Sequence, residues 1–232
     1  MNKEGGDMSG KLSMFSVVSS IMVGILYFSM VTLFILVPAG ENPVIDHHEQ
    51  KVLLIVGHYL LAFIGFFGMA AVLAISKRLV DNPTDLHVFT KLIALIGFAL
   101  MGINNFRQAG LDHDLSHEAV MKGGDVLDTV SISWAGLVEL SPDGWIDFGG
   151  VGLWMFIFSL STFRNEKFSK KLSILGLIAG SCLMITVLGN VIGFQPFVVA
   201  GIGIGGLTVI PLWFIFQGAG LYQLLKSKVD GA

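Results

Sequence analysis

The chain has 232 residues, of which 53% are hydrophobic and 13% are charged, and its formal net charge is -3. Because a soluble domain is about 45–50% apolar and about 25% charged, this composition excludes an ordinary soluble protein and predicts a single transmembrane domain over residues 1–232. A single cysteine excludes an intramolecular disulfide, and the basic residues are too scattered to form a patch for nucleic acid.

The first two membrane spans are predicted by long charge-free runs, at about residues 14–38 and 52–76. A helix that crosses a hydrocarbon core of about 30 Å needs about 20 apolar residues, and both runs exceed that length. The first run is also longer than the apolar core of a signal peptide, which has about 7–15 residues, and it shows no cleavage site of small residues. We therefore expect an uncleaved first span.

Spans three and four are predicted at about residues 89–108 and 145–163, where the charge-free runs are shorter. An acidic outer connection, residues 107–147, joins them. Within this connection, apolar residues recur at helical spacing after a predicted N-cap at Asp125. This pattern predicts an additional interfacial helix on the outer membrane surface. A strand through residues 130–134 is the alternative.

The last charge-free stretch is too long for one crossing and is predicted to form two spans, at about residues 172–193 and 197–225. The division falls at the turn residues 193–196, Gly-Phe-Gln-Pro, because proline disfavours a helix that continues from before it. Pro211 is expected to kink the sixth span. Glycine pairs that permit close helix approach, here favoured to pack within the bundle rather than on a dimer face, are Gly176 and Gly180, Gly189 and Gly193, and Gly201 and Gly205.

The distribution of charge sets the predicted topology. With six spans, all but three of the 14 Lys and Arg residues lie on the side of the two termini, the exceptions being Lys51, Arg107 and Lys122. Most Asp and Glu residues lie on the opposite side. Because cytoplasmic loops carry an excess of basic residues, we predict an all-α bundle of six transmembrane helices in the cell (inner or plasma) membrane, with both termini cytoplasmic. A five-span arrangement, the main alternative, spoils this bias.

Polar side chains within the spans gather in the outer half, where they are candidates for an outward-facing pocket. These candidates are His58, Asn104, Asn105, Arg107, Asp147 and Asn190. Polar groups in hydrocarbon are costly and usually face the bundle interior or a cavity, and we expect Arg107 and Asp147 to form a charge pair there. The alternative is that these residues bind lipid headgroups and cap helix ends. Gln217, in the inner part of span six, is the exception to the pattern.

A divalent metal site is a further hypothesis for the outer connection. His113 and His117 are four residues apart beside acidic side chains, and on a helix both imidazoles would share one face. His47 and His48, in the first outer loop, could complete such a site. The alternative is a solvated loop. No other cofactor is predicted, since a haem held by two histidines needs a pair within the spans, and only His58 lies in one.

Two stretches of the C-terminal part carry a resemblance to known sequences. They are residues 163–180, FRNEKFSKKLSILGLIAG, and residues 211–218, PLWFIFQG. Together with a long outer connection before span four, they resemble a broad group of uncharacterised bacterial six-helix membrane proteins that is described as a domain of unknown function. The resemblance implies a six-helix fold and no established activity.

The residues indicate a function only by class. No grouping of Ser, His and Asp typical of hydrolases is apparent, so we predict a non-catalytic accessory or scaffolding subunit of a membrane complex, or a protein that binds a lipid or apolar ligand. Its expected partners are membrane lipids and other membrane subunits or further copies of the chain, and not nucleic acid. The alternative is a small-solute transporter or sensor that uses the outward-facing pocket, and the third hypothesis is the outer metal site.

Overall fold

The computed structural model describes residues 14–36, 50–79, 83–122, 140–165 and 168–230, and every regular element in these ranges is helical. The elements in chain order are α1 (Met14–Leu36), α3 (Lys51–Ser76), η1 (Lys77–Leu79), α4 (Asp85–Lys122), η2 (Pro142–Gly144), η3 (Trp145–Gly150), α6 (Val151–Phe163), α7 (Lys170–Ile192), α8 (Gln195–Ala200), η4 (Gly201–Val209) and α9 (Ile210–Asp230). Of the short elements, η1 and η2 are 3₁₀ turns, whereas η3 and η4 are π-helical.

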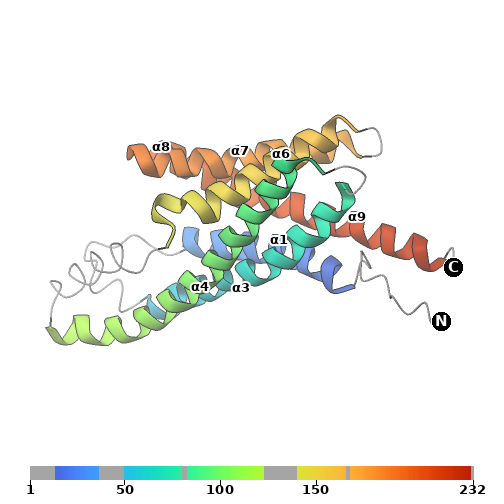
Figure 1. Cartoon of the computed structure of the whole chain (residues 1–232). Helices are drawn as coiled ribbons and strands as arrows, with labels where there is room; N and C mark the ends of the chain where they lie inside the picture. Colours follow the sequence, from blue (N-terminus) through green and yellow to red (C-terminus); the bar gives the residue numbers. More distant parts are fainter. Residues whose placement is uncertain (1–13, 37–49, 80–82, 123–139, 166–167, 231–232) are drawn as a thin grey trace, which may run out of the picture.

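Six helical segments are long and apolar enough to cross a membrane, which confirms the prediction of six spans. They are α1, α3, the first part of α4, η2 through α6, α7, and α8 through α9. Helix α1 begins and α9 ends at the same end of the bundle (Figure 1). We call this the terminal end and the opposite one the distal end. The chain is therefore a multi-pass membrane protein built as a six-helix bundle.

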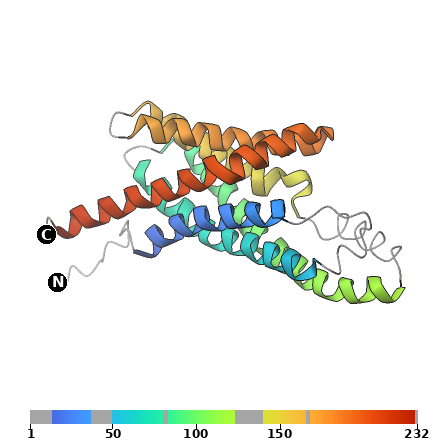
Figure 2. The same ribbon diagram turned by 180° about the vertical axis from the view of Figure 1, so that it is seen from behind.

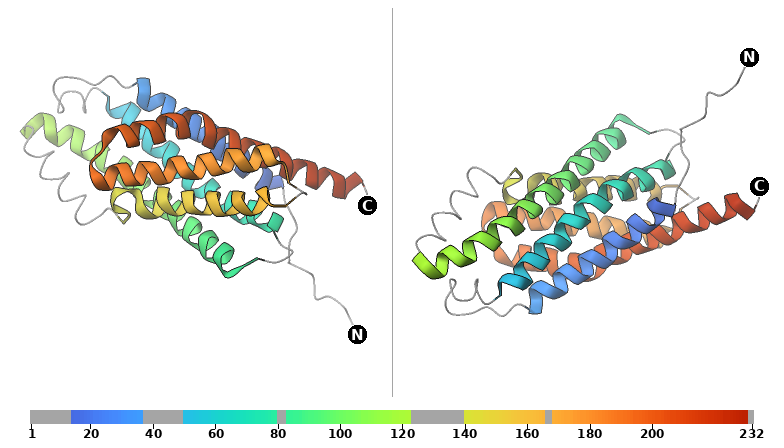
Figure 3. Two further views of the ribbon diagram at one scale, coloured as in Figure 1. Left: turned by 90° about the horizontal axis from the view of Figure 1, so that it is seen from above. Right: turned by 90° about the horizontal axis from the view of Figure 1, so that it is seen from below.

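The spans pack in chain order around a ring. Helix α3 lies between α1 and α4, α4 contacts α6 and η3, and α6 packs on α7. The chain then turns back along α7 through α8 and η4, and α9 and η4 close the ring against α1. Figure 2 shows α1 beside α9 from behind, and Figure 3 shows the bundle from above and below. This order makes helices that are neighbours in sequence also neighbours in space.

The third span differs most from its prediction. The charge-free run predicts residues 89–108, whereas α4 extends over 38 residues from Asp85 to Lys122, which is about 57 Å at 1.5 Å per residue. Its apolar part ends at Leu111, so the helix continues into the first part of the predicted outer connection. No proline interrupts this stretch, and a helix can extend into water because its backbone groups bond one another. The predicted interfacial helix and its strand alternative, at residues 123–139, lie outside the described residues.

The segment before Pro211, where a kink is expected, is π-helical. Element η4 precedes the proline, and the N–H of Ile210 bonds the carbonyl oxygen of Gly205, five residues back. A proline ring clashes with the carbonyl four residues before it in a regular α-helix. A π-helical turn changes this spacing and accommodates the ring without ending the span.

Glycines let α7 approach η4 closely. A Cβ atom on Gly201 would lie 2.2 Å from Thr186 Oγ1, and one on Gly205 would lie 2.8 Å from Cys182 Cβ. Only residues without a side chain permit these contacts, so the prediction that these two glycines serve the bundle is confirmed. Cys182 is buried at this contact as a free thiol.

The centre of the bundle is aromatic. Trp154 and Phe158 of α6 pack with Trp213 and Phe214 of α9, and Phe98 of α4 contacts Phe214. The rings of Trp154 and Trp213 meet edge to face, with centroids 5.6 Å apart, which is a favoured geometry for aromatic pairs. Two members of this cluster, Trp154 and Phe158, also line the cavity described below.

Candidate functional site

The predicted pocket residues at the distal end form separate groups. In the first group, His58 Nδ1 of α3 lies 2.9 Å from Asn105 Oδ1 of α4. Because the amide oxygen accepts, the proton of this bond is on Nδ1. The Asn105 amide nitrogen donates in turn to the Met101 carbonyl oxygen at 2.8 Å. These bonds tie α3 to α4 inside the membrane-spanning region.

Asn104 and Arg107 lie on the same helix but in different surroundings. Asn104 Oδ1 is buried and has no hydrogen-bond partner within the part of the chain that the structure describes. A buried polar atom without a partner costs about 1–3 kcal/mol, so this oxygen favours a water or ligand donor beside it. Arg107, one turn further toward the distal end, is exposed.

Asp147 caps the start of the fourth span. Ser141 Oγ donates to Asp147 Oδ1 at 2.9 Å, and it accepts from the N–H groups of Ile146 and Asp147 at 3.0 and 3.2 Å. The N–H of Phe148 also donates to Asp147 Oδ1, at 2.9 Å. These bonds satisfy N–H groups at the beginning of the helix. The bonds from Ser141 and Phe148 both end on Oδ1 of the carboxylate, and the expected charge pair with Arg107 stays a prediction.

Tyr27 of α1 is a polar group near Asp147 that sequence reasoning missed. Its hydroxyl is buried and has no hydrogen-bond partner in the described ranges, and it is close enough to Asp147 to interact with the charge of the carboxylate. A single tyrosine in an apolar run of the sequence does not indicate that its hydroxyl is buried near a carboxylate of another helix. Asn190, the remaining candidate, donates from Nδ2 to the Asp143 carbonyl oxygen at 3.2 Å and joins α7 to η2.

The predicted metal ligands are placed only in part. His113 and His117 lie on the distal portion of α4, so their four-residue spacing does fall on a helix. Their side chains, and both His47 and His48, lie outside the description. Among the described residues, no three His, Cys, Asp or Glu side chains are grouped to hold a metal. The metal site stays a prediction.

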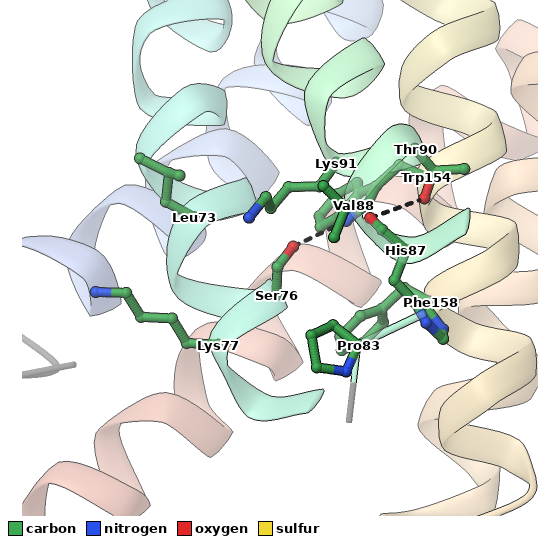
Figure 4. A pocket seen from close by; sticks show the side chains of 10 residues that line it. All are labelled: Leu73, Ser76, Lys77, Pro83, His87, Val88, Thr90, Lys91, Trp154 and Phe158. Carbon is green, nitrogen blue, oxygen red and sulfur yellow. Dashed lines mark hydrogen bonds between the residues drawn. The ribbon is translucent and has the colours of Figure 1, made fainter. Parts of the chain in front are cut away.

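A cavity at the terminal end was not predicted. It has a volume of about 220 Å³ and lies between α3, α4 and α6 (Figure 4). The residues that line it are Leu73, Ser76, Lys77, Pro83, His87, Val88, Thr90, Lys91, Trp154 and Phe158. The lining therefore combines an apolar and aromatic wall with two ammonium groups, two hydroxyls and an imidazole. No carboxylate lines it within the part of the chain that the structure describes.

Both ring nitrogens of His87 are engaged. Thr84 donates its backbone N–H to His87 Nδ1 at 3.2 Å, and Thr84 Oγ1 lies 2.8 Å from the same nitrogen. On the other side, His87 Nε2 lies 2.5 Å from Ser161 Oγ of α6. Since Nδ1 accepts, Nε2 carries the proton and donates to Ser161. The ring thus ties the beginning of α4 to α6 and forms a fixed wall of the cavity.

Ser76 presents a donor to the cavity. The indole N–H of Trp154 donates to Ser76 Oγ at 3.1 Å, as the dashed line in Figure 4 shows. The hydroxyl proton of Ser76 has no acceptor among the described residues. Thr90, in contrast, uses its hydroxyl proton on the His87 carbonyl oxygen at 3.3 Å. Neither Lys77 nor Lys91 pairs with a carboxylate of the described residues.

Beside this cavity, Arg78 connects three elements. Its Nη1 donates to Gln217 Oε1 of α9, its guanidinium lies 5.0 Å from the ring centroid of Phe168, and it packs against Gly220. Burial lowers the pKa of Arg78 below its usual value, but a guanidinium remains charged in proteins. This contact accounts for Gln217, the polar residue of the inner half that the sequence left without a role.

A second cavity lies on the other side of the α4–α6 pair, against α7. It has a volume of about 340 Å³ and is lined by Phe89, Ile93, Trp145, Gly149, Gly150, Leu153, Met184, Val187 and Leu188. All of these residues are apolar or glycine except for the indole nitrogen of Trp145. The two glycines of η3 leave the space that forms its floor.

Comparison with known proteins adds no relative: no protein-family model, no curated protein and no solved structure matches the chain. The resemblance to a family of unknown function therefore stays a prediction. The structural class, a multi-pass membrane protein, follows from the length and apolar composition of six helical segments among the described residues.

Proposed function

We propose that the protein is a non-catalytic membrane subunit that binds lipid in the cavities beside α4 and α6. The observation that carries this proposal is that this helix pair has an apolar-walled cavity on each side, one against α3 and the other against α7. Leu73 and Val88 of the first cavity and Phe89 and Leu188 of the second are 40–55% exposed, so both cavities open to the outside of the bundle.

In a membrane, lipid acyl chains surround the sides of the bundle. An empty apolar space loses dispersion contacts on its lining, and water does not fill it without polar partners. An acyl chain supplies these contacts in the cavity against α7. Binding lipid without converting it fits an accessory or scaffolding role, and we propose membrane lipids and neighbouring subunits as the partners.

The sidedness belongs to the same proposal. Among the described residues, the basic residues near the helix ends at the terminal end are Lys77 and Arg78 after α3, Lys91 in the second turn of α4, Arg164 after α6, Lys170 and Lys171 at the beginning of α7, and Lys226 and Lys228 near the end of α9. Basic residues are retained on the cytoplasmic side, which supports a cytoplasmic terminal end in the inner or plasma membrane of the cell. The cavity at that end then faces the cytoplasmic leaflet.

Native mass spectrometry of protein extracted gently from its own membrane tests the lipid-binding function. We expect lipid adducts on the wild type and lower occupancy in Gly149→Leu, which fills the cavity against α7. A Cβ atom at Gly149 would meet only Val187 Cγ2 at 3.6 Å and the Gly144 oxygen at 3.7 Å, so the backbone accepts the change. Gly110→Leu is the matched control, because its Cβ would have nothing within 4 Å. Wild-type protein that carries no lipid of any class would contradict the proposal.

The second candidate function is a transporter or sensor with an outward-facing polar pocket. It is favoured by the buried Tyr27 hydroxyl and Asn104 Oδ1, which have no partner in the described residues. A screen of small polar solutes by thermal shift would then find one that stabilises the wild type. Tyr27→Phe should abolish that shift while the melting temperature without solute stays close to wild type. A variant that responds like the wild type would argue against this candidate.

A further inference from the structure

We propose that the cavity between α3, α4 and α6 binds the phosphate of an anionic lipid, held by the ammonium groups of Lys77 and Lys91 and by the hydroxyl of Ser76. This inference rests on the proposed lipid-binding function and names the class of lipid. The membrane-facing cavity against α7 has no charged lining and gives no such selectivity.

The charge of the cavity is the first argument. Lys77 follows the end of α3 and Lys91 lies near the beginning of α4, so two separate elements each contribute a lysine to the lining. In Figure 4 the Lys77 side chain extends away from Ser76 and Lys91, and its flexible four-carbon stem would turn to bring the ammonium group to a shared ligand. No carboxylate of the described residues lines it, and Asp85, two residues before His87 on α4, is exposed and is not part of the lining. Two cations beside an apolar wall create a positive potential that only an anion balances. Basic pockets between helices at the cytoplasmic side are suited to lipid headgroups.

The pattern of hydrogen bonds is the second argument. Trp154 fixes Ser76 Oγ as an acceptor, which leaves the Ser76 hydroxyl proton free for a ligand oxygen. His87 cannot serve in the same way, because Thr84 and Ser161 already engage its two nitrogens. The imidazole is therefore a positioning group, and the phosphate contacts fall to Lys77, Lys91 and Ser76. Charge-assisted bonds to phosphate are about twice as strong as neutral ones.

The shape of the cavity distinguishes a lipid from a free phosphate. In Figure 4, the Lys91 side chain extends from α4 toward α3, above Ser76 and beside Leu73. Leu73 and Val88 are 46% and 40% exposed at the side of the cavity. These apolar residues continue from the ammonium groups onto the lipid-facing surface, where an acyl chain attached to the phosphate would lie. A free phosphate would leave this apolar surface unused.

The test compares phosphatidylglycerol with phosphatidylcholine by native mass spectrometry of the purified full chain. The test variant is Lys77→Gln/Lys91→Gln. The matched control is Lys170→Gln/Lys171→Gln, which removes the same charge from exposed positions at the same end of the bundle. Lys77→Arg/Lys91→Arg keeps the charge in the cavity, and inorganic phosphate added to the lipid complex forms the soluble arm.

Each lysine near an anionic lipid contributes about 1 kcal/mol, and about 1.4 kcal/mol changes an affinity tenfold. From the two lysines we therefore expect wild type to prefer phosphatidylglycerol by about thirtyfold. The preference should fall towards one in the glutamine test variant and persist in the control and arginine variants. Equal binding of both lipids by wild type would overturn the inference and leave the lipid-binding function intact, whereas binding of neither would overturn the function. A loss of preference in the control, or displacement of the lipid by equimolar inorganic phosphate, would also overturn the headgroup assignment.

Discussion

Gly176 of α7 shows how closely single residues are fitted in the core. A Cβ atom there would lie 2.0 Å from Ser159 Oγ and 2.3 Å from Trp213 Nε1. Both polar atoms are buried, and neither has a hydrogen-bond partner among the described residues. Because these atoms lie so close to the Cβ position, they already fill the space in front of the glycine, and no further atom fits there.

We expect Gly176→Ala to destabilise the protein by about 1–3 kcal/mol, the usual cost of overpacking a core. The added methyl group would collide with Ser159 Oγ and with the Trp213 ring, which is fully buried. The midpoint of thermal unfolding in detergent measures the effect, with Gly110→Ala as the control because its Cβ would meet nothing within 4 Å. A Gly176→Ala variant as stable as wild type would show that the core relaxes freely at this point.

Lys77 and Lys91 illustrate what residue patterns alone could not predict. Each lysine follows or precedes an apolar run and therefore looks like an anchor at the cytoplasmic side. Their common cavity depends on α3, α4 and α6 being neighbours, and on Trp154 reaching Ser76. These are contacts between helices, which hydropathy and charge do not encode. The sequence did reveal the candidate polar residues of the predicted outward-facing pocket, because isolated polar residues stand out in apolar runs. It did not reveal which of these residues contact one another.

At the scale of elements, charge-free runs predict the boundaries of a span correctly where turn residues also end the helix. The fifth and sixth spans separate at Gly193, which has a left-handed φ of 67°, and α8 begins with Pro196 in its first turn. The third span lacks such a signal, so α4 continues past its apolar part. The sequence also did not predict the π-helical elements η3 and η4. Pro211 explains only part of η4, and the remaining hydrogen bonding depends on neighbouring helices.

Arg78 joins elements at the terminal end, and its removal should loosen them. Arg78→Met leaves the amide of Gln217, which is 2% exposed, without its donor, at a cost of about 1–3 kcal/mol. We expect Arg78→Met/Gln217→Leu to recover part of this loss, because the buried amide is then absent as well. Thermal unfolding of both variants, beside the exposed control Arg164→Met, measures the coupling. Equal destabilisation by the single and double variants would refute the role of this bond.

At the scale of the whole molecule, the charge asymmetry and the cavities describe one orientation. The cations of the terminal end include Lys77 and Lys91, which line the cavity between α3, α4 and α6, whereas the distal part of α4 carries acidic and histidine residues beyond Leu111. If the terminal end faces the cytoplasm, the same lysines serve both as topology signals and as lipid ligands. An opposite orientation would place the basic cavity in the other leaflet.

Labelling of single cysteines in intact cells decides between these orientations. In a Cys182→Ala background, Leu140→Cys places a thiol at the distal end and Ser227→Cys places one at the terminal end, and both positions are exposed. Because basic segments stay in the cytoplasm, we expect a membrane-impermeant maleimide to label the thiol at position 140 in intact cells. Position 227 should react only after the membrane is opened. The reverse pattern would move the basic cavity to the outer leaflet and remove the argument that the positive-inside rule gives for its lipid.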